Sequence, residues 1–127
     1  MYDPKIEYKE NKKEIDNAIS SVLDHGIFIN GPEVKELEKN LAEYTNVKHA
    51  ITVSNGTDAI KIALLSLDIG IDDEVITVAH TWISTAEAIS IINAKPVFVD
   101  IDENTFNIDH KKIEEKINDK TKAILIV

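Results

Sequence analysis

The stretch ITVSNGTDAIKIALL, residues 51–65, decides the fold because its character changes twice along its length. It opens with Ile, Thr and Val, which are β-branched and predict a short strand. The SNGT segment that follows consists of turn and cap residues. From Ala59 onward, apolar side chains recur at the spacing of one helix face, which predicts a helix. The expected order is therefore strand, small-residue turn and helix.

This helix start has the features of an anion-binding site. The first backbone N–H groups of a helix have no intrahelical partners, and the helix dipole makes that end positive. Gly56 has no Cβ, so a ligand can approach its backbone closely. Together these features predict a phosphate cradle that needs no cationic side chain. The alternative is an ordinary capped helix with Asn55 or Thr57 as its N-cap. Neither the Gly-rich dinucleotide fingerprint nor a Walker loop is present.

Composition excludes several classes of function. The chain has 127 residues and a formal net charge of −9. All of its basic residues are lysines, which argues against nucleic acid as a partner and removes the bidentate arginine clamp for phosphate. The absence of cysteine excludes disulfides and thiolate metal sites. No apolar run is long enough for a bilayer, and residues 1–15 lack a signal-peptide core, so we expect a cytoplasmic protein without a membrane partner.

Two helices are predicted ahead of the opening stretch, at residues 10–25 and 32–44. Residues 27–30 between them form either a short strand or a loop. We interpret residues 1–48 as a helical lead-in to the rest of the chain. The second helix has an apolar stripe that we expect to be buried, which consists of Val34, Leu37, Leu41 and Tyr44.

Strands and helices alternate over residues 49–127, which predicts an α/β fold with a mainly parallel sheet and right-handed crossovers. Residues Ser84 to Glu87 have the pattern of a capping box, and Asp109 is a second helix cap. After residues 51–65, the predicted elements are strands at 74–78, 96–101 and 122–127 and helices at 85–93 and 109–118.

The last predicted strand, KAILIV at residues 122–127, has apolar side chains on both faces. We therefore expect it to be buried on both faces. The sequence stops inside this strand, which predicts that the chain is the N-terminal piece of a longer protein. The α/β domain of residues 49–127 is then incomplete at its C-terminal end.

Two loops are expected at the carboxyl edge of this sheet, where ligands bind in open α/β folds. The first is the SNGTD turn at residues 54–58, and the second, residues 79–83, contains Trp82. The indole of Trp82 is suited to stacking on a planar ring, or alternatively to packing over the sheet edge. We favour a structural role for His80. No His or carboxylate cluster has metal-ligand spacing, so no metal site is predicted.

Three motifs in this order resemble the N-terminal part of one family. They are SNGTDAIKIAL at residues 54–64, TWISTAEAI at 81–89 and PVFVDID at 96–102, with GPEVKELEKNLAEY ahead of them and TFNID behind. The combination resembles the DegT/DnrJ/EryC1/StrS family of sugar aminotransferases, which depend on pyridoxal 5'-phosphate. The resemblance implies the large domain of the aspartate aminotransferase-like fold.

The resemblance also assigns roles to residues. It implies that the backbone N–H groups of Gly56, Thr57 and Asp58 bind the cofactor phosphate, with Thr57 and Asp58 the main donors. It implies that Trp82 stacks on the pyridine ring of the cofactor. The reaction it implies is transfer of an amino group, usually from glutamate, to a nucleotide-linked keto-sugar. The active site would lie between the two subunits of a homodimer.

The same resemblance places the catalytic groups elsewhere. The Schiff-base lysine, the aspartate at the pyridinium nitrogen and the remaining phosphate ligands are expected beyond Val127. No catalytic residue is therefore assigned within this chain, and the isolated chain is expected to be inactive. Three alternatives stay open: a sugar dehydratase of the same family, a non-catalytic binding or regulatory module, and a phosphate-binding domain unrelated to pyridoxal phosphate.

Overall fold

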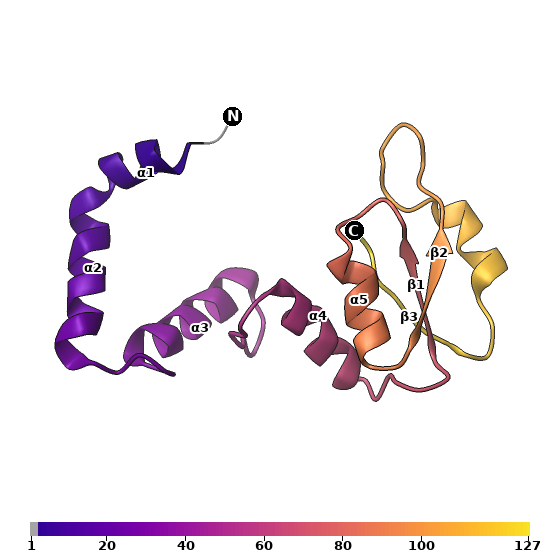
Figure 1. Ribbon diagram of the computed structural model, residues 1–127, viewed down its shortest axis with the longest axis horizontal. Helices are drawn as coiled ribbons and strands as arrows, with labels where there is room; N and C mark the ends of the chain where they lie inside the picture. Colours follow the sequence, from indigo (N-terminus) through magenta and orange to yellow (C-terminus); the bar gives the residue numbers. More distant parts are fainter. Residues whose placement is uncertain (1–2) are drawn as a thin grey trace. The chain divides into compact units, whose positions relative to one another are not determined.

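The computed structural model describes residues 3–127 and divides the chain into two compact units (Figure 1). The first unit extends through Thr52, and the second is Val53–Val127. The first unit contains α1 (Pro4–Glu10), α2 (Lys12–His25) and α3 (Pro32–Thr45). The sequence predicts α2 and α3, whereas α1 is an additional helix. Residues 27–30 form a loop, which decides between the two alternatives for that segment.

The apolar stripe of α3 is not buried, contrary to the prediction. Leu37 and Leu41 are exposed, and Tyr44 is 89% exposed. Among the described residues of the first unit, no hydrophobic side chain is fully buried. The physical reason is that a helical stripe is buried only when a second element packs over it, and no element of residues 3–52 covers this one.

The second unit is a three-stranded parallel sheet with helices, as the alternating pattern predicts. The strands are β1 (Glu74–Val78), β2 (Lys95–Val99) and β3 (Thr121–Ile124), in the spatial order β2-β1-β3. The helices α4 (Gly56–Leu65) and α5 (Ser84–Ile91) pack against each other. The predicted strand at 74–78 agrees with β1 at both ends, whereas the other two predicted strands extend beyond β2 and β3.

The hydrophobic core lies between β1 and the helices. All residues of β1 are buried, as expected for a central strand that is covered on both edges. Its Val75 belongs to one cluster of buried side chains with Leu64 of α4 and Ile89 of α5. The cluster extends into the connection after α5. The other members of this cluster are Ile69, Ile92 and Ala94.

Two predictions of local secondary structure are wrong, each for a physical reason. Residues 51–53 are not a strand, because a strand needs a neighbouring strand and none of the described strands pairs with them. The N–H of Thr52 donates instead to the Glu38 carboxylate at 2.8 Å. Residues 109–118 form two 3₁₀ turns, His110–Lys112 and Glu114–Lys116, instead of one α-helix. The β-branched Ile113 and Ile117 and the shortness of the segment disfavour a longer helix. Asp109 nonetheless caps the first turn, as predicted.

The capping box predicted at Ser84 does not form. Ser84 is already the first residue of α5, and the N-cap residue Ile83 has helical dihedral angles and no side-chain cap bond. The helix starts through tight main-chain bonds, in which the N–H of Thr85 donates to the carbonyl of Trp82 at 3.0 Å. A capping box requires an N-cap residue with extended dihedral angles, so the helical angles of Ile83 exclude it.

The strand β3 and the residues after it are partly buried on one face, although burial on both faces was predicted. Ala123 and Leu125 pack against the core, whereas Ile124 is exposed and Ile126 is 70% exposed. The helices α4 and α5 supply the core contacts on the inner face, and β3 is an edge strand. The outer face therefore has no comparable cover within the second unit.

Replacement of Ile89 by alanine tests the core of the second unit. Ile89 is fully buried in the cluster, so Ile89→Ala should lower the free energy of unfolding by about 2–5 kcal/mol. The matched control is Ile91→Ala on the same helix, where the side chain is 59% exposed, and its effect should be below about 1 kcal/mol. Urea denaturation of both variants measures the difference, and equal losses would contradict this core.

Candidate functional site

The turn that starts α4 is held by Asn55. The Oδ1 atom of Asn55 accepts a hydrogen bond from the N–H of Asp58 at 2.9 Å, and its Nδ2 atom donates to Asp58 Oδ2 at 3.1 Å. Asn55 itself is extended, as an N-cap residue must be. Of the two N-cap candidates from the sequence, the structure selects Asn55 over Thr57.

The carboxylate of Asp58 is fully engaged inside the same turn. Its Oδ1 atom accepts from the Lys61 ammonium at 2.5 Å, and its Oδ2 atom also accepts from the Ser54 hydroxyl. The Lys61 ammonium, followed by the Ser54 hydroxyl, lowers the pKa of the Asp58 carboxyl below its ordinary value. Asp58 therefore stays ionised near neutral pH, and Lys61 balances its charge beside the helix start.

Two main-chain donors are left open at this turn. The N–H groups of Gly56 and Thr57 have no acceptor among the described residues, because they precede the first intrahelical bond. A Cβ added at Gly56 would meet nothing within 4 Å, so the space in front of the backbone is open. The N–H of Asp58, by contrast, already bonds to Asn55. The open donor pair is thus Gly56 and Thr57, whereas the resemblance favours Thr57 and Asp58.

Trp82 lies in the loop between β1 and α5, with 78% of its surface exposed. This loop is held by a hydrogen bond of 3.0 Å between the hydroxyls of Thr81 and Thr85. The indole borders a hollow of about 240 Å³ that Phe98 of β2 also lines. The stacking role of Trp82 remains a prediction, beside the alternative in which the ring packs over the sheet edge.

Both features lie at the same end of the second unit. Figure 1 shows that α4 and α5 run opposite to β1, so that their first turns point toward the end where β1 finishes. The open N–H pair begins α4, and Trp82 lies two residues before the start of α5. The structure therefore directs both predicted features to the carboxyl edge of the sheet, although residues 51–53 are not part of that sheet.

The loop after β2 brings an aromatic ring next to His80, a contact that the sequence did not predict. Asp102 Oδ1 accepts from the N–H groups of Asn104 and Thr105, each at 3.0 Å, which folds residues 102–107 into a tight loop. Phe106 in this loop has a positive φ of 59°, and its ring centroid lies 5.9 Å from that of His80. His80 thus packs against an aromatic ring, in line with a structural role. An Asp followed by Asn and Thr is a signal for such a loop.

No group of three or more His, Cys, Asp or Glu residues within 3–127 has an arrangement that could hold a metal ion. Over the same residues, none of the helices combines the length and the apolar character needed to cross a membrane.

Comparison with known proteins decides the family. The model of the DegT/DnrJ/EryC1/StrS aminotransferase family matches residues 9–127, nearly the whole chain. The chain belongs to this family. Solved aminotransferases also share its fold, which confirms the α/β class and the similarity to pyridoxal-phosphate-dependent transferases.

Three relatives of this DegT/DnrJ/EryC1/StrS chain show the range of the family. UDP-2-acetamido-2-deoxy-3-oxo-D-glucuronate aminotransferase of Pseudomonas aeruginosa is 46% identical over 98% of this chain and 35% of the relative. A pleiotropic regulatory protein of Geobacillus stearothermophilus is 46% identical over 100% and 34%. The crystal structure of ntda from Bacillus subtilis with bound cofactor PMP has a TM-score of 0.89 at 40% identity, covering 92% of this chain and 27% of that chain.

These matches have one common limit. This DegT/DnrJ/EryC1/StrS chain spans about a third of the length of the curated relatives it matches.

Proposed function

We propose that residues 1–127 are the N-terminal part of a pyridoxal-phosphate-dependent aminotransferase that acts on a nucleotide-linked keto-sugar. The amino donor is an amino acid, with glutamate the expected one. The observation that carries the proposal is the family match over residues 9–127 combined with an open N–H pair at the predicted phosphate site. Residues 1–48 are a helical lead-in, and residues 49–127 are the first part of the cofactor-binding domain.

The residues at the carboxyl edge fit a phosphorylated aromatic cofactor. Gly56 and Thr57 offer two open donors at a helix start, where the dipole favours a dianion. Asp58 stabilises the turn, and its charge is balanced by Lys61, so it adds little repulsion toward a phosphate. Trp82 offers an exposed flat face for a pyridine ring. When bound, the cofactor supplies the electron sink for amino-group chemistry, and this chain supplies its placement.

The names of the relatives support a proposal for the substrate and the cofactor. The Pseudomonas aeruginosa relative is named for a UDP-linked 3-oxo sugar, and the Bacillus subtilis structure contains PMP, an aminated form of the cofactor. These names support a nucleotide-sugar substrate and a pyridoxal phosphate cofactor for the whole protein. We further propose that the protein is cytoplasmic and works as a homodimer with a shared active site. The catalytic lysine belongs to the part of the protein after Val127.

Two alternatives differ in what the rest of the protein contains. A dehydratase of the same family would share the phosphate turn and Trp82, so this segment fits it equally well. A regulatory role is favoured by one observation, the name of the Geobacillus stearothermophilus relative, which matches over the whole of this chain. Such a protein would keep the cradle for the cofactor without transfer of an amino group to a sugar.

Amino-group transfer tests the activity directly. The full-length protein, supplied with pyridoxal phosphate, glutamate and UDP-2-acetamido-2-deoxy-3-oxo-D-glucuronate, should release 2-oxoglutarate and an amino-sugar in equal amounts. The 127-residue chain should release none, because it lacks the catalytic lysine. Coupled detection of 2-oxoglutarate and mass spectrometry of the sugar give both readings. Sugar dehydration without loss of glutamate would favour the dehydratase, and turnover by the short chain would refute the assignment.

The phosphate donors can be tested by removal of one N–H group. Gly56→Pro removes the donor, and proline suits this position because Gly56 is the first residue of α4 and Asn55 is extended. The matched control, Gly56→Ala, adds a Cβ but keeps the N–H. Loss of a hydrogen bond to a charged group, about 1.5–3 kcal/mol, should raise the Kd of pyridoxal phosphate roughly 10- to 100-fold in the proline variant alone.

Pyridoxal without phosphate serves as the second ligand in this experiment. Its Kd, measured by absorbance titration of the full-length protein, should be equal in the two Gly56 variants. A loss of affinity for both ligands would assign the effect to a distorted turn, and an unchanged affinity for pyridoxal phosphate would remove Gly56 from the phosphate site.

Trp82 is tested by the size and shape of its replacement. Trp82→Ala should raise the Kd of pyridoxal phosphate by about 2- to 10-fold, the equivalent of 0.5–1.5 kcal/mol for an aromatic pair, whereas Trp82→Phe should retain most of the affinity. The neighbouring exposed Ile83, as Ile83→Ala, is the control. An affinity that does not change in Trp82→Ala would favour a phosphate-binding domain unrelated to pyridoxal phosphate.

A further inference from the structure

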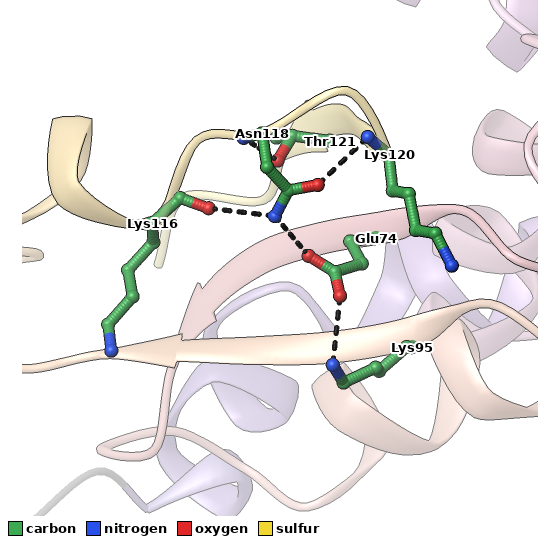
Figure 2. Close-up of polar contacts among 6 residues, drawn as sticks. All are labelled: Glu74, Lys95, Lys116, Asn118, Lys120 and Thr121. Atoms are coloured by element: carbon green, nitrogen blue, oxygen red, sulfur yellow. Dashed lines mark hydrogen bonds and ion pairs between the residues drawn. The ribbon is translucent and has the colours of Figure 1, made fainter.

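A carboxylate at the opposite end of the sheet ties its three strands together. Glu74, the first residue of β1, is only 8% exposed. Its Oε1 atom accepts from the Lys95 ammonium of β2 at 2.8 Å, and its Oε2 atom accepts from Nδ2 of Asn118 at 2.8 Å (Figure 2). Asn118 lies just before β3. We call these three residues, Glu74, Lys95 and Asn118, the Glu74 clasp.

Asn118 also shapes the turn that leads into β3. Its Oδ1 atom accepts from the N–H of Lys120 at 2.9 Å, and its main-chain carbonyl accepts from the N–H of Thr121 at 2.9 Å. The Thr121 hydroxyl accepts from the N–H of Asn118 at 3.0 Å, and the N–H of Glu74 donates to the Lys120 carbonyl at 2.8 Å. One amide side chain therefore joins a closed turn to the start of the central strand.

The clasp has a charged centre. The Lys95 ammonium, and then the Asn118 amide, lower the pKa of the Glu74 carboxyl below its ordinary value, with a smaller contribution from Lys120. Glu74 is therefore an anion at neutral pH. A buried carboxylate that loses one of its donors is costly, so the turn is strongly favoured to stay where Asn118 can reach Glu74.

The apolar pattern of β3 does not by itself determine which face of the strand packs against the core. Strand register is well specified when only one face is apolar, because a shift of one residue turns every side chain over. From residue 123 to 127, AILIV is apolar on both faces. Lys122 lies at the solvent-exposed start of β3, where its long side chain reaches water from either face. Main-chain ladder bonds, such as that from the Leu125 N–H to the Ile76 carbonyl, are available to any residue.

The observed pairing contains an irregularity at the clasp. Glu74 is opposite Thr121, yet the next residue, Val75, is opposite Ala123, so that Lys122 is an extra residue in β3. Regular pairing from Thr121 onward would place Lys122 opposite Val75 and would turn Ile124 and Ile126 toward the core. The bulge instead turns Ala123 and Leu125 inward.

We propose that the Glu74 clasp, together with the bulge it imposes at Lys122, decides which face of β3 meets the core. The clasp fixes Thr121 opposite Glu74. The extra residue, Lys122, then places every later side chain of β3 on the face opposite to the one it would have in regular pairing. The bulky Ile124 and Ile126 are left outside by this arrangement, although the burial of two isoleucines would remove more apolar surface from water than that of Ala123 and Leu125. The proposal concerns the fold alone and is independent of what binds at the carboxyl edge.

Single cysteines report the two faces, since the chain has no cysteine of its own. Ala123→Cys lies on the inner face and should react slowly with a maleimide, whereas Ile124→Cys on the outer face should react fast. Asn118→Asp replaces the donor Nδ2 by an oxygen that repels Glu74, and it should abolish or reverse this difference in rate. Asn104→Asp adds the same charge at an exposed position outside the clasp and should leave the difference unchanged.

A swap of donor and acceptor completes the test. In Glu74→Gln with Asn118→Asp, the new amide can donate to the new carboxylate. The reporter at position 123 should then react slowly again, and the reporter at position 124 fast. A third reporter, Ala88→Cys in the fully buried part of α5, should stay protected in every variant. An unchanged order in Asn118→Asp would overturn the proposal, as would failure of the swap to restore it. Exposure of the Ala88 reporter would also overturn it, because the clasp would then hold the whole unit.

Discussion

The complete burial of β1 is the constraint on which the rest of the second unit depends. The strands β2 and β3 pair with its two edges, and α4 and α5 pack over the face that carries Val75. Burial also obliges each polar group of β1 to find a partner. Thr77 donates its hydroxyl proton to the Leu125 carbonyl at 3.0 Å, and Glu74 is held by Lys95 and Asn118.

The two ends of this sheet use polar groups in opposite ways. At the amino end, the Glu74 carboxylate is satisfied by donors from β2 and from the turn before β3, which leaves nothing for a ligand. At the carboxyl edge, Asn55 and Lys61 satisfy the Asp58 backbone N–H and carboxylate, and they leave the Gly56 and Thr57 N–H groups open. Paired polar groups therefore stabilise the amino end of the sheet. At the carboxyl edge, the N–H groups left without a partner are the donors available to a ligand.

Much of the site was predictable because its signals are local. A glycine at a helix start, an Asn three residues before a main-chain donor and a lone tryptophan after a strand are all visible in the sequence. The occupied N–H of Asp58 was not predictable, because either Asn55 or Thr57 can act as a cap on pattern alone. The Phe106 ring beside His80 was also missed, since the contact joins residues 26 positions apart through a positive φ.

The sequence by itself determined the alternation of helix and strand, the parallel sheet and the family, because periodicity and short motifs depend on neighbouring residues. Tertiary structure alone decided that residues 51–53 are unpaired, that the stripe with Tyr44 is exposed and that β3 turns Ala123 inward. Each of these outcomes depends on a partner distant in sequence. A strand, a buried stripe and a strand register exist only when that partner is in place. The local pattern of side chains does not show whether the partner is present.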